Sequence, residues 1–275
     1  MMEFWQNLLR IMDYQMQTPQ LFGWFHIACL ALTVLATVAL CFHHKEDSAK
    51  RVRSVVLITA IVVALAEIYK QINYSFSYTD GITFDYQWYA FPFQFCSTPM
   101  YVGLLAGVLP KGKLQQALYS YLATFAVFAG LCVMIYPGDV FVGTLGINIQ
   151  TVICHGSMIC VGVYLFYTGT VKLEHRTIGR AMLVFACTVS MAVLFNEIAY
   201  WTGLLERETF NMFFVSRHCD PSLPVYSWVQ AIVPYPWCLL IYIAGFTAAS
   251  YLILLIGMGI RNISTTLVRK DKIRI

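Results

Sequence analysis

The sequence predicts an all-α, polytopic membrane protein in which seven transmembrane helices form one bundle. Three observations lead to this prediction. Hydrophobic residues make up 59% of the 275-residue chain and charged residues only 12%, and the mean hydropathy of +0.66 is far above that of an ordinary soluble domain. Apolar runs of about 20 residues, the length that crosses roughly 30 Å of hydrocarbon, recur along the chain. Basic residues gather in alternate connections between these runs.

The apolar runs divide the chain into seven spans with short connections, which leaves no room for a separate soluble domain. Residues 1–275 are therefore predicted to form a single transmembrane domain. The predicted spans are Leu21–Phe42, Ser54–Asn73, Phe93–Leu109, Gln116–Tyr136, Asn148–Thr170, Ala181–Trp201 and Trp237–Ile260.

The basic residues predict the orientation of the spans, because Lys and Arg accumulate in short loops on the cytoplasmic side. Fourteen of the 18 basic residues follow the odd-numbered spans: Lys45, Lys50, Arg51, Arg53, Lys111, Lys113, Lys172, Arg176, Arg180, Arg261, Arg269, Lys270, Lys272 and Arg274. The N-terminus is thus predicted outside, with residues 1–20 as an interfacial segment, and the C-terminus inside, with residues 261–275 as a basic cytoplasmic tail. Residues 1–20 are too polar for a signal peptide.

The net charge of +4 is explained by this orientation and by attraction to anionic headgroups. We therefore expect membrane lipids as partners, no nucleic acid, and a location in the plasma (cytoplasmic) membrane. Protein partners are not predicted.

The nine cysteines show no paired spacing of the disulfide or zinc type, so we expect no metal and no other cofactor. Most of them lie inside predicted helices, where cysteine usually packs as a small apolar residue. Cys96 and Cys219 are the exceptions. Both lie where polar chemistry is considered, and for Cys219 a disulfide on the outside is a further alternative.

The first part of the chain places ionisable groups near the outer ends of two spans. Phe4–Met16 has the apolar spacing of a short surface helix. His26 lies about one turn inside the first span, where it is either functional or hydrogen-bonded to a neighbour. Glu67, Lys70 and Gln71 share one face of the second span, so that Glu67 and Lys70 neutralise each other. This pair either braces the bundle or lines a polar cavity.

The third span opens with the sequence FPFQFCSTPM, which starts at Phe91. A hairpin is predicted in the preceding Tyr74–Trp88 segment, with its turn at Asp80 and Gly81. Pro92 suits the first turn of a helix, which would place Gln94, Cys96 and Ser97 in the helix's first turns. The helix amides there favour a thiolate, whereas apolar burial favours the neutral thiol.

The later spans add further polar groups near their outer ends. The fourth span is predicted to be scaffold. The fifth carries Gln150 and His155, the latter at nearly the depth of Cys96, where it either packs or acts chemically. The sixth ends with Asn196, Glu197 and Tyr200. The segment from Thr202 to Pro236 is predicted to cap the bundle or re-enter it.

Together these groups predict one polar cavity open to the outside, since polar side chains are expensive to bury in a membrane unless they are paired or face water. The predicted cavity residues are His26, Glu67, Lys70, Gln71, Gln94, Ser97, Gln150, Asn196, Glu197 and Tyr200.

Within this cavity Cys96 and His155 have the residue types of acyl transfer. His155 would accept the thiol proton, Cys96 would attack an ester carbonyl, and Gln94 or Asn196 would stabilise the oxyanion. The alternatives are a non-enzymatic seven-span receptor or ligand-binding protein, and a solute transporter using Glu67, Lys70 and His155. A transporter is less favoured, because no internal repeat and no polar path to the inner side are visible.

Several short motifs resemble the YwaF / transmembrane protein 164 family of integral membrane proteins. They are FPFQFCS from Phe91, the outer-half His155, NEIAYWTG from Asn196, NMFF from Asn211 and PYPW at Pro234. The resemblance implies a seven-helix bundle and a cysteine-dependent phospholipid/lysophospholipid acyltransferase or acyl hydrolase. It further implies that Cys96, in its QFCS context, accepts the acyl group, with His155 as partner. The family motif has aliphatic residues around the cysteine where this chain has Phe91, Phe93 and Phe95.

Overall fold

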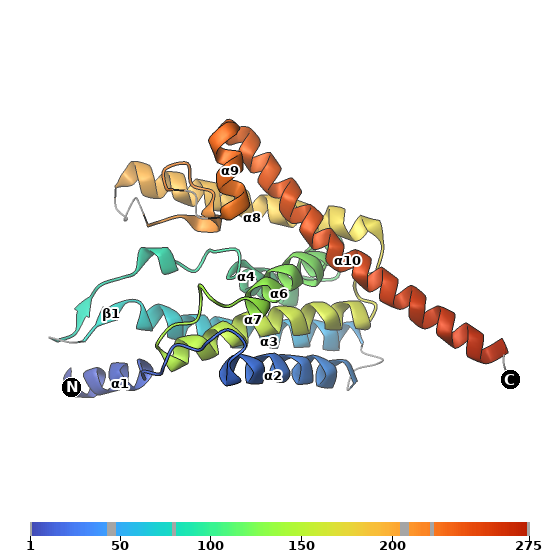
Figure 1. Cartoon of the computed structure of the whole chain (residues 1–275), viewed down its shortest axis with the longest axis horizontal. Coiled ribbons are helices and arrows are strands. Elements are labelled where there is room, and N and C mark those ends of the chain that lie inside the picture. The colour runs from blue at the N-terminus through green and yellow to red at the C-terminus, as the bar shows by residue number, and fades with distance from the viewer. Residues whose placement is uncertain (1, 43–47, 79–80, 204–208, 221–222, 274–275) are drawn as a thin grey trace.

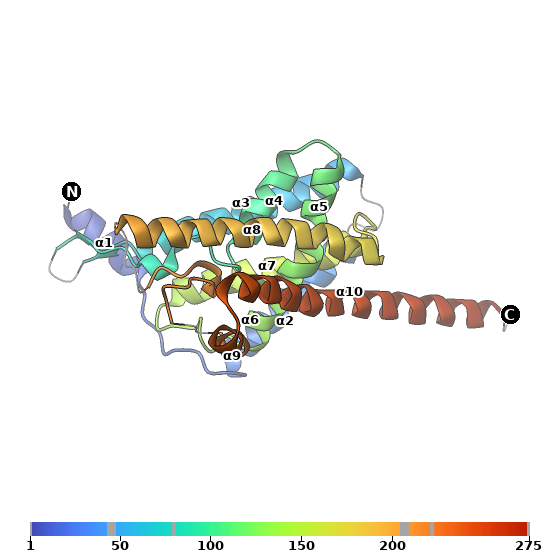
Figure 2. The same ribbon diagram turned by 90° about the horizontal axis from the view of Figure 1, so that it is seen from above.

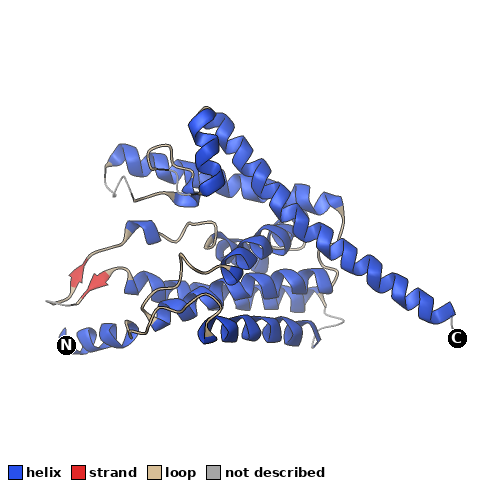
Figure 3. Cartoon of the chain, in the orientation of Figure 1, coloured by secondary structure: helices blue, strands red, loops and turns tan. Residues whose placement is uncertain are grey.

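The computed structural model describes residues 2–42, 48–78, 81–203, 209–220 and 223–273, and these residues are predominantly helical. Figure 1 shows the helices in chain order, and Figure 3 separates them from the two short strands. The helices are α1 (Met2–Met12), α2 (Trp24–Phe42), α3 (Ala49–Asn73), α4 (Thr98–Val108), α5 (Lys113–Tyr121), α6 (Val127–Ile135), α7 (Leu145–Tyr167), α8 (His175–Thr202), α9 (Pro224–Ile232) and α10 (Tyr235–Ile273). The shorter elements are the strands β1 (Phe76–Ser77) and β2 (Thr83–Phe84), the 3-10 turns η1 (Trp88–Ala90) and η3 (Met212–Phe214), and the π-helical turn η2 (Leu122–Ala126).

Six of the predicted spans are confirmed as helices that are long and apolar enough to cross a membrane. Within the described residues these are Trp24–Phe42, Ala49–Asn73, Lys113–Ile135, Leu145–Tyr167, His175–Thr202 and Tyr235–Ile263. The fourth span is continuous from α5 through the π turn η2 to α6. The last span continues into the predicted basic tail, because α10 runs unbroken to Ile273.

The predicted third span is helical only over the eleven residues of α4, and its predicted start at Pro92 is wrong. Pro99 lies in the first turn of α4, so Cys96 precedes the helix instead of lying one turn within it. A helix begun at Pro92 would have carried Pro99 in its interior, where proline removes a hydrogen bond and clashes with the preceding turn. Starting at Thr98 avoids this cost, and residues 91–97 form turns instead.

The 91–108 stretch nevertheless runs along most of α3, in the opposite direction. At one end the Gln71 side chain donates to the carbonyl of Ala90 over 2.8 Å. At the other end the guanidinium of Arg53 donates to the carbonyl of Gly107. Since Gln71 and Arg53 are 18 residues apart on α3, the stretch covers about 27 Å along that helix.

Helix α7 and the continuous α5–η2–α6 helix form the centre of the bundle (Figures 1 and 2). α7 packs against α2, α3, α6 and η2, while α8 packs on α5 and α10 on α8. The central helices bury 56% and 72% of their most apolar windows, whereas the other four long helices bury 28% or less. The outer helices therefore present most of their apolar surface to the surroundings, as expected in lipid.

The two ends of the bundle differ. One end, here called the hairpin end, holds α1, the β1–β2 hairpin and the C-terminal end of α8 (Figure 1). The opposite end, the basic end, holds the starts of α3, α5 and α8. The predicted surface helix and hairpin are both confirmed. Gly81 in the hairpin turn has φ +119, while Asp80 lies outside the described residues. Of the fourteen basic residues that predict the orientation, Lys45 and Arg274 also lie outside them.

Two glycines allow α6 and η2 to approach α7 closely. A Cβ on Gly162 of α7 would lie 2.0 Å from a methyl group of Val127 and 2.8 Å from the carbonyl oxygen of Leu122. A Cβ on Gly130 of α6 would lie 2.7 Å from the carbonyl oxygen of His155. Small residues at such contacts are typical of helix pairs in membranes. The close approach fixes the position of His155 along the axis of α6.

We predict that Gly162→Ala destabilises the protein by about 1–3 kcal/mol, because the added methyl overpacks the α6–α7 contact. Thermal unfolding of the detergent-solubilised protein measures the effect as a lower Tm. Gly245→Ala is the matched control, since a Cβ on Gly245 of α10 meets nothing within 4 Å and alanine favours a helix. Equal Tm values for the two variants would contradict the packing of α6 on α7.

Candidate functional site

Two non-helical stretches of backbone meet inside the hairpin end of the bundle, residues 91–97 and 210–216. The amide of Gln94 donates to the carbonyl of Asn211 over 3.1 Å and accepts from the backbone N–H of Phe213 over 2.9 Å. The amide of Asn196 on α8 donates to the carbonyl of Met212 over 3.0 Å and accepts from its N–H over 2.8 Å. Both predicted cavity amides therefore bind the backbone around η3.

The backbone held by these amides is strained. Phe213 and Phe214 both have φ 57, the left-handed region that bulky residues rarely adopt. The carbonyl of Phe213 accepts a hydrogen bond from the hydroxyl of Tyr242 on α10 over 2.9 Å. The ring of Phe213 is fully buried and packs against Phe93 and Phe95. The phenylalanines around Cys96 thus anchor η3, and Phe91 and Phe93 also pack on Phe195 of α8.

The carboxylate of Glu67 is 5% exposed and receives three donors. The Lys70 ammonium lies 2.7 Å from Oε1, and the Gln71 amide donates to the same oxygen over 2.8 Å. The Gln150 amide, from α7, donates to Oε2 over 3.1 Å. The predicted pairing of Glu67 with Lys70 is present, and Gln71 and Gln150 complete the group. This cluster joins α3 to α7 and is called the Glu67 cluster below.

Cys96 lies beside the Glu67 cluster. Its carbonyl accepts from the thiol of Cys154, which lies one turn along α7 from Gln150, over 3.4 Å. Its own thiol interacts with the side chain of Ser97 and lies within range of the charges of Glu67 and Lys70. The Lys70 ammonium also acts on Cys154 and on His155.

His155 is 4% exposed and has one ring nitrogen without a partner. Its Nδ1 lies 2.7 Å from the carbonyl oxygen of Thr151. Because a carbonyl only accepts, Nδ1 carries the proton and Nε2 presents its lone pair. Among the described residues no hydrogen-bond donor reaches Nε2. A buried acceptor without a donor costs about 1–3 kcal/mol, which makes this atom a candidate for chemistry.

His26 lies apart from these groups and is fully hydrogen-bonded. Its Nε2 donates to the carbonyl of Met134 on α6 over 2.8 Å, and its Nδ1 accepts from the N–H of Phe22 over 3.0 Å. Phe22 has φ 55. His26 therefore stabilises the start of α2 against α6, which is the structural alternative considered for it.

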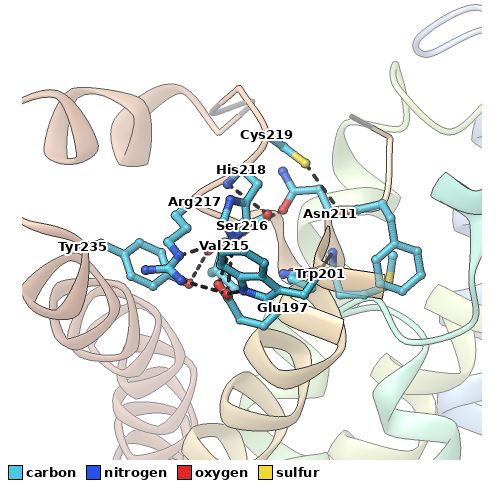
Figure 4. Close-up of polar contacts among 12 residues, drawn as sticks. Glu197, Trp201, Asn211, Val215, Ser216, Arg217, His218, Cys219 and Tyr235 are labelled. Atoms are coloured by element: carbon cyan, nitrogen blue, oxygen red, sulfur yellow. Dashed lines mark hydrogen bonds and ion pairs between the residues drawn. The ribbon is translucent and has the colours of Figure 1, made fainter. Parts of the chain in front are cut away.

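Glu197 belongs to a separate cluster at the end of α8 (Figure 4). Tyr200 belongs to the same cluster. Glu197 binds Arg217 at 2.9 Å and His218 at 3.2 Å, and it accepts from the indole of Trp201 over 3.0 Å. The His218 ring stacks on Tyr200 with centroids 3.5 Å apart. These contacts tie residues 217–218 to α8. Near them, the thiol of Cys219 donates to the carbonyl of Phe210 over 3.6 Å.

The structure thus brings Glu67, Lys70, Gln71, Gln150, Cys96 and Ser97 together, with His155 in range of Lys70, and places the other predicted residues elsewhere. The sequence reasoning missed Cys154 as a member of this site. The available signal was its position one turn after Gln150 on the same face of α7. Within the described residues, no three His, Cys, Asp or Glu side chains lie close enough together to hold a metal ion.

Comparison with known proteins gives one match. The sequence model of the TMEM164 family matches residues 20–255, which run from the approach to α2 well into α10. Neither the curated proteins nor the solved structures contain a significant match to the chain.

We predict that Asn196→Ala loosens the 210–216 backbone, because the N–H and carbonyl of Met212 lose their partners at a cost of about 1–3 kcal/mol each. Hydrogen–deuterium exchange of the peptide covering residues 210–216 should accelerate, and Tm should fall. Ser190→Ala is the control on the same helix, since the exposed Ser190 hydroxyl binds only the carbonyl of Ala186 in its own helix. Unchanged exchange in Asn196→Ala would refute the role given to this amide.

Proposed function

We propose that this chain, which belongs to the TMEM164 family, transfers fatty acyl groups between membrane lipids with Cys96 as its nucleophile. The family match and the six long apolar helices make it an integral, multi-pass membrane protein. The acyl-transfer chemistry is our inference from the residues around Cys96. Hydrolysis of an acyl group is the same chemistry with water as the final acceptor.

We further propose seven membrane crossings, with the N-terminus outside, the C-terminus inside, and the plasma membrane as the location. The 91–108 stretch supports the seventh crossing, because it spans about 27 Å alongside α3 although only α4 is helical. Non-helical backbone is tolerated at membrane depth where protein covers it, and here Phe195 and Phe213 pack on the 91–97 stretch through Phe93. The hairpin end would then face outward.

The unpartnered Nε2 of His155 is the observation that carries the proposal. His26, in contrast, has both ring nitrogens hydrogen-bonded. In His155 the carbonyl of Thr151 fixes the tautomer and leaves Nε2 as a base. The Lys70 charge reaches both His155 and Cys96. A base, a thiol and a cation are the three groups that acyl transfer through a thioester requires.

The proposed reaction has two half-steps. In the first, Nε2 of His155 takes the thiol proton through a bridging water, and the Cys96 sulfur attacks the ester carbonyl of a phospholipid. Lys70 stabilises the oxyanion, the ester C–O bond breaks, and the departing lysophospholipid oxygen takes the proton from His155. In the second, His155 deprotonates the hydroxyl of another lysophospholipid. That oxygen attacks the thioester, a new ester forms, and the protonated Cys96 thiol is restored.

We assign the stabilisation of the oxyanion to Lys70 and no longer to Gln94 or Asn196. Both amides are already bound to the backbone around η3. The Lys70 ammonium uses one contact on Glu67, and an ammonium has three protons to donate. Glu67, held by Gln71 and Gln150, keeps the ammonium in place.

We predict that the wild-type protein, purified and incubated with phospholipid, gains the mass of one acyl group on Cys96, and that Cys96→Ser abolishes thiol-linked loading and transfer. His155→Ala should slow loading by about 10²–10⁴-fold, the usual contribution of a general base. Cys187→Ser is the control, because Cys187 is an exposed thiol on α8. Unchanged lipid turnover in Cys96→Ser and His155→Ala would refute the enzyme. Saturable ligand binding that survives Cys96→Ala would instead favour a receptor.

We predict that Lys70→Met slows acyl loading by about 10²–10³-fold, the loss typical of a removed oxyanion donor. Because Lys70→Met also leaves Glu67 without its cation, the double variant Lys70→Met with Glu67→Gln separates the two effects. If Lys70 acts on the reaction, the double variant recovers Tm but not the loading rate. Recovery of both would reduce Lys70 to a counter-ion for Glu67.

A further inference from the structure

A polar pocket lies at the hairpin end, where the segment after α1, the end of α3 and the β1–β2 hairpin meet (Figure 1). Its volume is about 290 Å³, close to the lower end of the range for small-molecule sites. Two carboxylates and three aromatic rings line it, those of Asp13, Asp85, Tyr74, Phe76 and Tyr78. We call it the hairpin pocket.

Hydrogen bonds hold the walls of the pocket together. The hydroxyl of Tyr78 donates to the carboxylate of Asp13 over 2.5 Å, which ties the hairpin to the segment after α1. The hydroxyl of Thr144, next to α7, donates to the same carboxylate over 2.8 Å. The backbone N–H of Gln87 donates to the carbonyl of Tyr74 over 2.9 Å and closes the base of the hairpin onto the end of α3. The pocket is therefore formed by the fold itself, without a ligand.

The two carboxylates of the pocket lack a paired cation. Asp13 accepts from neutral donors, among them the hydroxyls of Tyr78 and Thr144. The exposed carboxylate of Asp85 makes no hydrogen bond or ion pair within the described part of the chain. The charge of Arg10 acts on Tyr78, but no described lining residue is basic. The lining is therefore negatively charged and favours a cationic ligand.

The aromatic rings indicate which kind of cation fits. Tyr74, Phe76 and Tyr78 all line the pocket, and the face of an aromatic ring attracts an ammonium group, above all one that carries methyl groups. Calcium and magnesium instead take six or more oxygen ligands. Among the described residues no three His, Cys, Asp or Glu side chains lie close enough together to hold a metal ion. Carboxylates combined with rings thus match an organic ammonium ion better than a metal.

The hairpin pocket is separate from the Glu67 cluster and open to the surroundings. Asn73, which ends α3 and also lines the pocket, lies six residues beyond Glu67, or about 9 Å along the helix. The Glu67 carboxylate is already paired with Lys70. Phe76 and Asp85 are exposed at the rim. With the hairpin end facing outward, as proposed above, a ligand arrives from the external solution or from the headgroup layer.

We propose that the hairpin pocket binds an organic ammonium group such as that of choline, with Asp13 and Asp85 supplying the charge and the three rings the apolar surface. A free solute and a lipid headgroup can both present this group. The site does not depend on acyl transfer, because none of its described lining residues belongs to the group around Cys96.

The test measures binding of choline to the full-length protein in dodecyl maltoside by isothermal titration calorimetry. Choline should bind saturably, whereas its uncharged isostere, with carbon in place of nitrogen, should not. Asp85→Asn should weaken choline binding about 5–50-fold, because one charge is lost at a partly solvated site. Asp139→Asn is the matched control, since it removes an exposed carboxylate outside the lining. Both side chains are exposed, so both variants should keep the Tm of the wild type.

Phe76→Leu tests the rings separately from the charge. Loss of one ring at an exposed site should weaken choline binding about 2–5-fold. Phe84→Leu is the control, because Phe84 pairs with Phe76 across the hairpin, is 70% exposed and lies outside the lining. Equal choline affinities in Phe76→Leu and Phe84→Leu would remove the rings from the site and overturn the choice of an organic ammonium ion.

Lipid added to the micelles distinguishes the two sources of the ammonium group. If the ligand is a headgroup, phosphatidylcholine should compete with free choline and phosphatidylglycerol should not. If it is a solute, choline should bind equally in the presence of either lipid. Absence of saturable choline binding without added lipid, equal binding of the uncharged isostere, or equal affinities in Asp85→Asn and Asp139→Asn would each overturn the site. None of these outcomes bears on acyl loading of Cys96.

Discussion

The need to satisfy backbone hydrogen bonds away from water shapes the hairpin end of this bundle. Each unpaired N–H or carbonyl group in hydrocarbon costs several kcal/mol, yet two non-helical stretches, 91–97 and 210–216, lie inside the bundle. Backbone turns pair much of 91–97, as in the N–H of Ser97 to the carbonyl of Gln94, whereas side chains pair most of 210–216. Gln94 and Asn196 each supply both a donor and an acceptor to the backbone around η3. The thiol of Cys154 serves the carbonyl of Cys96.

These hydrogen bonds separate supporting groups from those left for chemistry. His26, Gln94 and Asn196 have their polar atoms occupied, whereas Nε2 of His155 is buried without a donor. The Glu67–Lys70 pair is costly in a different way, since a buried ion pair adds little to stability and is often no better than apolar packing. Three donors on Glu67 offset this cost without removing it. Retaining such a pair beside a thiol is easier to explain by function than by stability.

Helix content, the positions of the six long spans and the Glu67–Lys70 pair follow from local patterns, because apolar period and i, i+3 spacing are properties of one segment. The start of α4 required a comparison of two prolines, since only a start near Pro99 keeps both out of a helix interior. The partners of Gln94 lie 117 and 119 residues away, so its spacing in the sequence carries no sign of them. Cys154 and its partner Cys96 are likewise 58 residues apart, so the sequence around Cys154 does not distinguish it from a cysteine that only packs.

The place where the polar and apolar regions meet distinguishes the possible functions. A transporter needs polar groups that continue through the bundle, whereas below the Glu67 cluster the small cavity between α3, α4 and α7 is lined mainly by apolar side chains such as Val56, Val63 and Val161. In a phospholipid the ester carbonyl lies where the apolar chain joins the polar headgroup. On α3 the corresponding boundary falls between Val63 and Glu67, about 6 Å apart along the helix. Cys96 is adjacent to this boundary through Cys154 and the charges of Glu67 and Lys70. A binding protein has no need of a thiol and an unpaired imidazole near that boundary, but an enzyme that cleaves the ester does.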